Sequence, residues 1–121
     1  MSCVLRIEGS PDAIESLVES HSFDLLEVEE QSVAIAVSHA SMDDFLQQVR
    51  DAISFLHARG PALEEARRSI GIEAATLDFA VSRSHSFTQS ISLPAPLLLL
   101  AGRCNIDIEV SLYPVSDEEA V

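Results

Sequence analysis

Short stretches in which apolar and polar side chains alternate run through most of this chain. Near the amino terminus, Cys3, Leu5 and Ile7 alternate with Arg6 and Glu8. Successive side chains of a strand point to opposite faces, so this alternation predicts a half-buried strand. The same pattern elsewhere, and one apolar run typical of a strand buried on both faces, predict five to six strands. They cover residues 3–8, 26–29, 33–37, 75–82, 87–93 and 106–113.

A longer stretch with helical periodicity begins near Ser41. Large apolar side chains, among them Leu46 and Ile53, recur there at steps of three and four residues, which predicts an amphipathic helix over residues 41–59. Ser41 and Asp44 have the spacing of a capping box, and a glycine–proline pair follows as a stop signal. We expect this helix to anchor the core. Shorter helices are predicted over residues 11–21, 61–69 and 97–101.

The order of these elements favours an α+β fold. It is typical of a mixed, largely antiparallel sheet of about five to six strands with two to three helices on one face. A ferredoxin-like split arrangement, extended at its carboxyl-terminal end, is compatible with the order. We expect residues 1–114 to form a single domain and residues 115–121 to form an acidic carboxyl-terminal tail.

The charge of the chain restricts the partners it can bind. The 121 residues include 20 acidic and 7 basic side chains, which gives a net charge of −13. Binding to nucleic acid or to an anionic membrane depends on Lys and Arg, so neither is expected as a partner. All the basic residues are arginines, which excludes mechanisms that need a lysine nucleophile or a lysine phosphate ligand.

No segment of the sequence predicts export or membrane insertion. Residues 1–6 lack the features of a signal peptide, and the longest apolar run, residues 97–101, is too short to span a bilayer. The two cysteines, Cys3 and Cys104, are too few for a disulfide scaffold and are expected as small buried side chains. We therefore expect a cytoplasmic protein. No cofactor is expected, because the interaction module favoured below needs none.

The acidic residues are concentrated in the first part of the chain. No basic residue occurs between Ile7 and Val49, whereas ten carboxylates do. Unpaired carboxylates are rarely buried, so they are expected on solvent-facing sides of the first helix, the second strand and its turn. Such a face attracts a cationic partner, although an acidic surface that only aids solubility is the alternative. The predicted interaction residues are Glu15, Glu19, Glu27, Glu29 and Glu30.

A second candidate site lies on the polar face of the last predicted strand. Asp107 and Glu109, two residues apart, are expected on one side of that strand about 6 to 7 Å from each other, a spacing compatible with cation binding or acid–base pairing. A solvated strand face is the alternative. The predicted ligand-binding residues are His85, Asp107, Glu109 and Tyr113. No catalytic residue is predicted, because no serine lies in a glycine-flanked nucleophile elbow. No metal site is predicted, because no histidine belongs to a recognised ligand pattern.

Two segments resemble a family of small bacterial proteins known only as a domain of unknown function. The closing segment carries the resemblance in residues 92–94, 97–100 and 106–114, and the opening segment in residues 3–10. Some members of such families look like immunity proteins of toxin systems. The resemblance implies a non-enzymatic, one-domain inhibitor whose acidic face covers a basic toxin, and no catalytic residues carry over.

Three hypotheses of function follow from the sequence. The first is a bacterial, immunity-like interaction module whose acidic face binds a cationic protein. The second is a small enzyme or ligand-binding domain with a pocket near His85, Asp107 and Glu109. The third is a homo-oligomer in which an apolar sheet face or a strand edge pairs with its copy.

Overall fold

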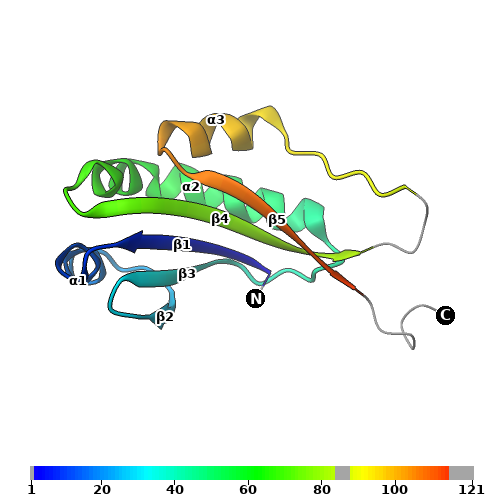
Figure 1. The fold of residues 1–121 in the computed structure, drawn as a ribbon. Coiled ribbons are helices and arrows are strands. Elements are labelled where there is room, and N and C mark those ends of the chain that lie inside the picture. Colours follow the sequence, from blue (N-terminus) through cyan, green and yellow to red (C-terminus); the bar gives the residue numbers. More distant parts are fainter. Residues whose placement is uncertain (1, 84–87, 115–121) are drawn as a thin grey trace.

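The computed structural model of the protein describes residues 2–83 and 88–114 and shows an α+β fold, as the sequence predicts (Figure 1). One five-stranded mixed sheet is accompanied by three helices. In chain order the elements are β1 (Cys3–Gly9), α1 (Pro11–Ser20), β2 (Leu25–Val28), β3 (Ser32–Ser38), α2 (Phe45–Arg68), β4 (Ile72–Arg83), α3 (Ala95–Arg103) and β5 (Asp107–Pro114).

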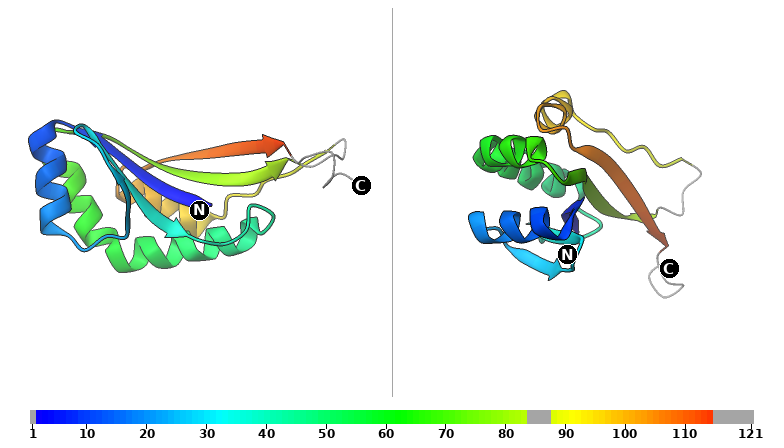
Figure 2. Two further views of the ribbon diagram at one scale, coloured as in Figure 1. Left: turned by 90° about the horizontal axis from the view of Figure 1, so that it is seen from below. Right: turned by 60° about the vertical axis from the view of Figure 1, so that its left-hand side comes forward.

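The sheet has the strand order β2-β3-β1-β4-β5. Its first four strands pair antiparallel, while β5 is parallel to β4. This is the ferredoxin-like split arrangement, in which β1-α1-β2 and β3-α2-β4 interleave, extended by α3 and β5. Crossover connections between parallel strands are right-handed, so α1, α2 and α3 all come to lie on the same face of the sheet, as Figure 2 shows. The opposite face carries no helix within the described residues.

The core lies between the sheet and the helices. Along β4, the buried residues Ala75, Leu77, Phe79 and Val81 alternate with half-buried ones that point to the open face. The ring of Phe45, in the first turn of α2, contacts Phe79 edge-on, with 5.4 Å between ring centroids. The period-two pattern of the sequence therefore identifies the inward face of β4 correctly.

Helix α2 differs from its prediction at both ends. It begins at Phe45 because Asp44 is the N-cap and accepts the backbone N–H of Gln47 at 3.2 Å, whereas Ser41 belongs to the preceding turn. It also continues through Pro61 to Arg68 as one helix of 24 residues, where two helices were expected. A proline inside a helix costs about 3 kcal/mol, which tertiary packing of the following turns offsets.

The packing beyond Pro61 is visible in two contacts. Leu63, two residues later, is buried in the core. The thiol of Cys104, at the end of α3, donates to the carbonyl of Gly60 over 3.6 Å. These contacts hold the second half of α2 against α3 and the sheet, so the glycine–proline pair does not end the helix.

The expectation that Leu46 anchors the core is wrong, because its side chain is 61% exposed. The helix starts only one residue earlier, at Phe45, and the first residue of its buried stripe is Gln48, two residues after Leu46. The stripe consists of Gln48, Val49, Ala52, Leu56 and Leu63. Ile53, the other residue singled out, packs against the core and is half-buried.

The returning strand predicted over residues 87–93 is also wrong for the part that the structure describes. Residues 88–94 contain no helix or strand, and Phe87 lies outside the described residues. A strand returning from β4 would need a free place beside it, but β1 and β5 occupy both sides of β4. Ile91 and Leu93 instead pack against the core as the chain leads into α3.

Both cysteines are buried and free, in accordance with the sequence. Among the described residues, none of the helices combines the length and the apolar character needed to cross a membrane.

Candidate functional site

The five carboxylates singled out from the sequence are exposed. We call them the acidic surface: Glu15, Glu19, Glu27, Glu29 and Glu30. The first two belong to α1, and the others to β2 and the turn that follows it. The backbone N–H of Gly9 donates to the carbonyl of Gln31 at 3.0 Å, which places that turn beside the junction of β1 and α1. The two acidic segments therefore share one end of the sheet (Figure 1).

Helix α1 packs one side into the core and exposes the other side, which carries its carboxylates. The Oγ of Ser10 caps the helix by accepting a backbone N–H of the first turn at 3.2 Å, and Ile14 and Leu17 pack into the core. Glu15 and Glu19 lie on the opposite side of the helix and face solvent. Like charges four residues apart on a helix are destabilising by about 0.2–0.5 kcal/mol. The pair therefore does not stabilise α1.

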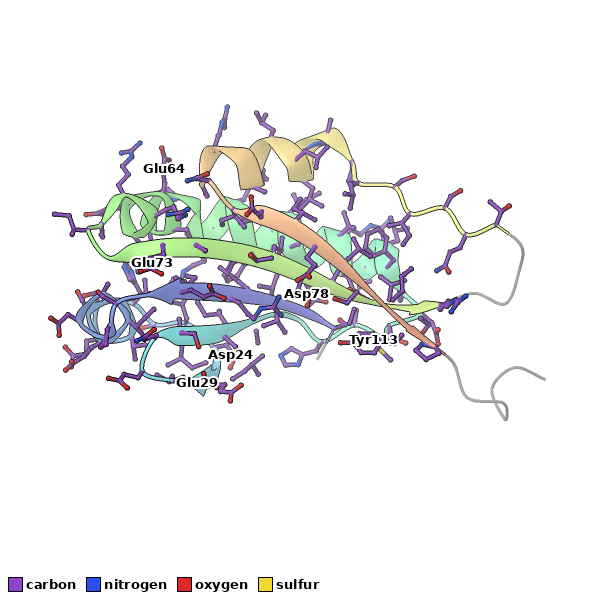
Figure 3. All side chains as sticks on the ribbon, viewed as in Figure 1. Asp24, Glu29, Glu64, Glu73, Asp78 and Tyr113 are labelled. Carbon is purple, nitrogen blue, oxygen red and sulfur yellow. The ribbon has the colours of Figure 1, made fainter. Side chains whose placement is uncertain are left out.

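The hairpin of β2 and β3 presents the other three carboxylates. Glu27 lies opposite Ala34 in the pairing of the two strands, on the open face of the sheet. In the turn, Glu29 accepts a hydrogen bond from the Oγ of Ser32 at 3.3 Å, and Glu30 is exposed beside it. Figure 3 shows Glu29 at this edge of the sheet. A neutral hydroxyl leaves the charge of Glu29 in place.

The arginines with described contacts are held by other partners. Arg59 donates to the carbonyl of Ser22 at 3.0 Å, and its guanidinium lies 4.2 Å from the centre of the Phe23 ring. Arg67 donates to two backbone carbonyls at the start of β4 and to the carbonyl of Asn105, shortly before β5. Arg6 and Arg68 form ion pairs, and their partner carboxylates lie outside the acidic surface. Within residues 2–83 and 88–114, no ion pair neutralises the acidic surface.

The open face of the sheet forms a shallow groove of about 520 Å³. Small side chains, Ala34 and Ala80, make part of its floor, which is why the face is hollowed there. Leu26 and Tyr113 lie among its lining residues, and both are large and exposed. The full lining is Ser2, Val4, Arg6, Leu26, Glu27, Ala34, Asp78, Ala80 and Tyr113.

A charged network crosses three strands on this face. Arg6 Nη1 lies 3.0 Å from Asp78 Oδ2, and Arg6 Nη2 lies 2.7 Å from Glu109 Oε2. The hydroxyl of Ser111 donates to Asp78 Oδ1 at 2.8 Å. The hydrogen bond that Arg6 donates to Asp78 is the largest cause that raises the pKa of Arg6 above its ordinary value, and the hydrogen bond to Glu109 adds to it. The network holds the parallel strand β5 to the rest of the sheet.

The structure places the four predicted ligand-binding residues differently. Glu109 belongs to the network with Arg6, and Tyr113 lines the groove. Asp107 is exposed two residues before Glu109 on the same face of β5. His85 lies outside the described residues. A pocket that combines all four stays a prediction.

Sequence reasoning missed Arg6 as the partner of Glu109, and Asp78 as the second carboxylate that Arg6 binds. Each occupies a polar position of an alternating strand, which was the available signal. Arg6 and Glu109 are 103 residues apart, and only the sheet order brings them together.

A larger groove, of about 700 Å³, runs between α1 and the carboxyl-terminal end of α2. Its lining includes His21 and Glu65 together with several serines. Among the described residues, no three or more His, Cys, Asp or Glu side chains are placed to hold a metal ion.

No protein-family model, curated protein or solved structure matches this chain. The resemblance of its two end segments to small bacterial proteins accordingly stays an expectation.

Proposed function

We propose that this protein is a non-enzymatic interaction module whose acidic surface binds a cationic protein. The observation that supports the proposal is the exposure of five carboxylates at one end of the sheet with no arginine ion pair among the described residues. The arginines with described contacts are engaged elsewhere, so the negative field at this end is open to a partner.

The physical basis is long-range attraction followed by pairing of charges. A net charge of −13 creates a strong negative potential around a chain of this size. Complementary potentials raise association rates by about 10- to 1,000-fold, and the effect falls as ionic strength rises. At physiological salt the screening length is about 8 Å, so carboxylates must lie close together to act jointly.

An inhibitor that covers a basic toxin is the specific form of this function that we favour. The resemblance of the end segments implies it, and the acidic surface is compatible with it. An inhibitor of this kind works by occupying a surface, so it needs no catalytic group and no cofactor.

The proposal is tested by capture of binding proteins from a lysate of the source cell at low and high salt. We compare the wild type with Glu15→Gln/Glu19→Gln and with Glu27→Gln/Glu29→Gln/Glu30→Gln. The control, Asp43→Asn/Glu73→Gln, removes two exposed charges outside the acidic surface. A cationic protein that binds the wild type and the control, and is lost from the other two variants and at high salt, is the expected result.

Two outcomes contradict the proposal. One is a specific partner that binds all four proteins equally. The other is a partner whose association rate does not change with salt, because electrostatic steering requires that dependence.

A second candidate function is ligand binding in the open-face groove. The groove of about 520 Å³ falls within the size range of small-molecule sites, and Tyr113 with Arg6 supplies polar groups. Nuclear magnetic resonance titration with a library of small compounds tests it. Shifts confined to Val4, Ala34 and Ala80 support it, whereas shifts confined to other regions contradict it.

A further inference from the structure

Strand β5 leaves one edge of the sheet open. Among the described residues it pairs only with β4, and every one of its residues is at least partly exposed. Leu112 and Tyr113 are exposed large side chains on opposite faces of this strand. An unpaired edge with exposed apolar side chains is a template for pairing with another strand.

Helix α3 adds apolar surface at the same margin of the molecule. It packs against α2 and β5 through its buried residues Leu97 and Ala101. Leu98 and Leu99 lie on the rest of the helix and are exposed. Figure 1 shows α3 and β5 together at this margin, away from α1 and β2.

We propose that two copies of this chain pair β5 with β5 in antiparallel orientation, with Val110 on the two-fold axis. Directly opposed residues of an antiparallel pair point to the same face, which limits the possible registers. Centring on Val110 pairs residues 107 to 113 with their copies, which is all of β5 except Pro114. A symmetric interface of this kind closes at two copies and joins two sheets into one.

The charges of β5 favour this register. Asp107 lies opposite the second copy's Tyr113, whose hydroxyl is a donor, and Glu109 lies opposite Ser111. No carboxylate directly faces another. Glu109 is also paired with Arg6 at 2.7 Å, a guanidinium that it shares with Asp78. Centring on Glu109 instead would place that carboxylate against its own copy.

The opposite edge of the sheet is protected against the same pairing. Strand β2 has only four residues, and its register with β3 shifts between Leu25 and Glu27. Self-pairing there would crowd Asp24, Glu27, Glu29 and Glu30 of two copies against one another, because all four are exposed. Since β2 and β5 are the two edges, pairing through β5 leaves each acidic surface at an outer end of the joined sheet.

This pairing does not depend on the proposed function. The two proposals predict different effects of salt on binding. Screening reduces repulsion between two copies that each carry −13, so self-association should persist or tighten as salt rises. Binding of a cationic partner should weaken under the same change.

Sedimentation velocity at 50 mM and 500 mM salt tests the pairing. The wild type should sediment as a species of twice 13.1 kDa at micromolar concentration. Leu112→Lys should be monomeric, with the circular dichroism of the wild type. Val28→Lys is the matched control on β2, because the two side chains are 50% and 51% exposed, and it should remain dimeric. A monomeric wild type at both salt concentrations overturns the proposal, and so does equal disruption by the two variants.

Cross-linking tests the register separately. Directly opposed residues have Cα atoms about 4.5–5.5 Å apart, which suits a disulfide. Under mild oxidation Val110→Cys should form a covalent dimer, whereas Leu112→Cys, which lies far from its own copy, should not. Cross-linking of Leu112→Cys in preference to Val110→Cys overturns the register proposed here.

Discussion

The guanidinium of Arg6 in β1 reaches across β4 to the carboxylate of Glu109 in β5, with Nη2 and Oε2 2.7 Å apart. The strand between them contributes Asp78, which accepts from the same guanidinium at 3.0 Å. One side chain thus ties the added parallel strand to the centre of the antiparallel sheet. The contact also gives Glu109 a cationic partner at the edge that we propose for pairing.

Removing this contact should loosen β5 more than the rest of the sheet. Hydrogen bonds between charged groups are worth about 1.5–3 kcal/mol, but the Arg6 side chain is 43% exposed, so we expect Arg6→Gln to cost about 1 kcal/mol. Urea unfolding measures the loss, and hydrogen exchange should show faster exchange of β5 amides. Arg50→Gln, at an exposed position of α2, is the control and should change neither. Unchanged exchange in β5 of Arg6→Gln would contradict the role given to this network.

The buried amide of Gln48 should contribute to stability. Its Nε2 donates to the carbonyls of Ser41 at 3.1 Å and Ala80 at 2.9 Å, which joins the chain before α2 to β4. Gln48→Leu leaves both carbonyls without this donor, at an expected cost of about 1–3 kcal/mol. Gln31→Leu, at an exposed position, should stay within about 0.5 kcal/mol of the wild type. Equal unfolding midpoints in urea for the two variants would rule out this contribution.

Replacement by aspartate should destabilise the fold strongly at one leucine of α2 and hardly at all at another. Leu56 is 1% exposed, and a carboxylate there is expected to cost at least about 3–5 kcal/mol and to unfold the chain. Leu46 lies exposed in the first helical turn, where an acidic side chain suits the helix dipole, so Leu46→Asp should change stability by less than about 0.5 kcal/mol. Circular dichroism during thermal unfolding distinguishes the two. Loss of structure in Leu46→Asp would show that our assignment of the buried stripe is wrong.

Stability should fall in alkaline solution because of Cys3. Burial raises the pKa of this thiol far above its ordinary value of 9.0, and Asp78 and Asp51 add to the effect. Below about pH 9 the thiol is protonated in both the folded and the unfolded state, so its titration takes nothing from the stability of the fold. Above it the unfolded chain loses the proton while the folded chain keeps it, which removes up to about 1.4 kcal/mol per pH unit.

The measurement is urea unfolding at pH 7, 9 and 10 for the wild type and Cys3→Ala. The variant should show a shallower loss of stability between pH 9 and pH 10. Parallel curves for the two proteins would mean that Cys3 does not cause the loss.

Local patterns in the sequence were sufficient to predict features that depend on a single strand or helix. The alternation of Cys3, Leu5 and Ile7 identified β1 and its inward face, because a strand buried on one side requires that period. Exposure of carboxylates such as Glu15 and Glu30 followed from the cost of burying an unpaired charge. The sequence of elements was compatible with a ferredoxin-like split arrangement, but the strand order itself comes from the structure.

Features that depend on contacts between residues far apart in the chain could not be predicted from local sequence patterns. The stop signal at Gly60 and Pro61 is outweighed by the burial of Leu63 and by the contact from Cys104. Ser41 and Asp44 are both good caps, and only the structure shows that the second one begins α2. The partners of Arg6 depend on the order of strands separated by many tens of residues, which no local period encodes.

The most direct test of the acidic surface is nuclear magnetic resonance titration of the isotope-labelled protein with an octa-arginine peptide at low salt. We expect the largest shifts in α1 and in the β2–β3 hairpin, and we expect them to disappear in a variant that carries Gln at Glu15, Glu19, Glu27, Glu29 and Glu30. Shifts spread evenly over the chain, or concentrated on β5, would show that this end of the sheet does not focus the charge and would contradict the proposed function.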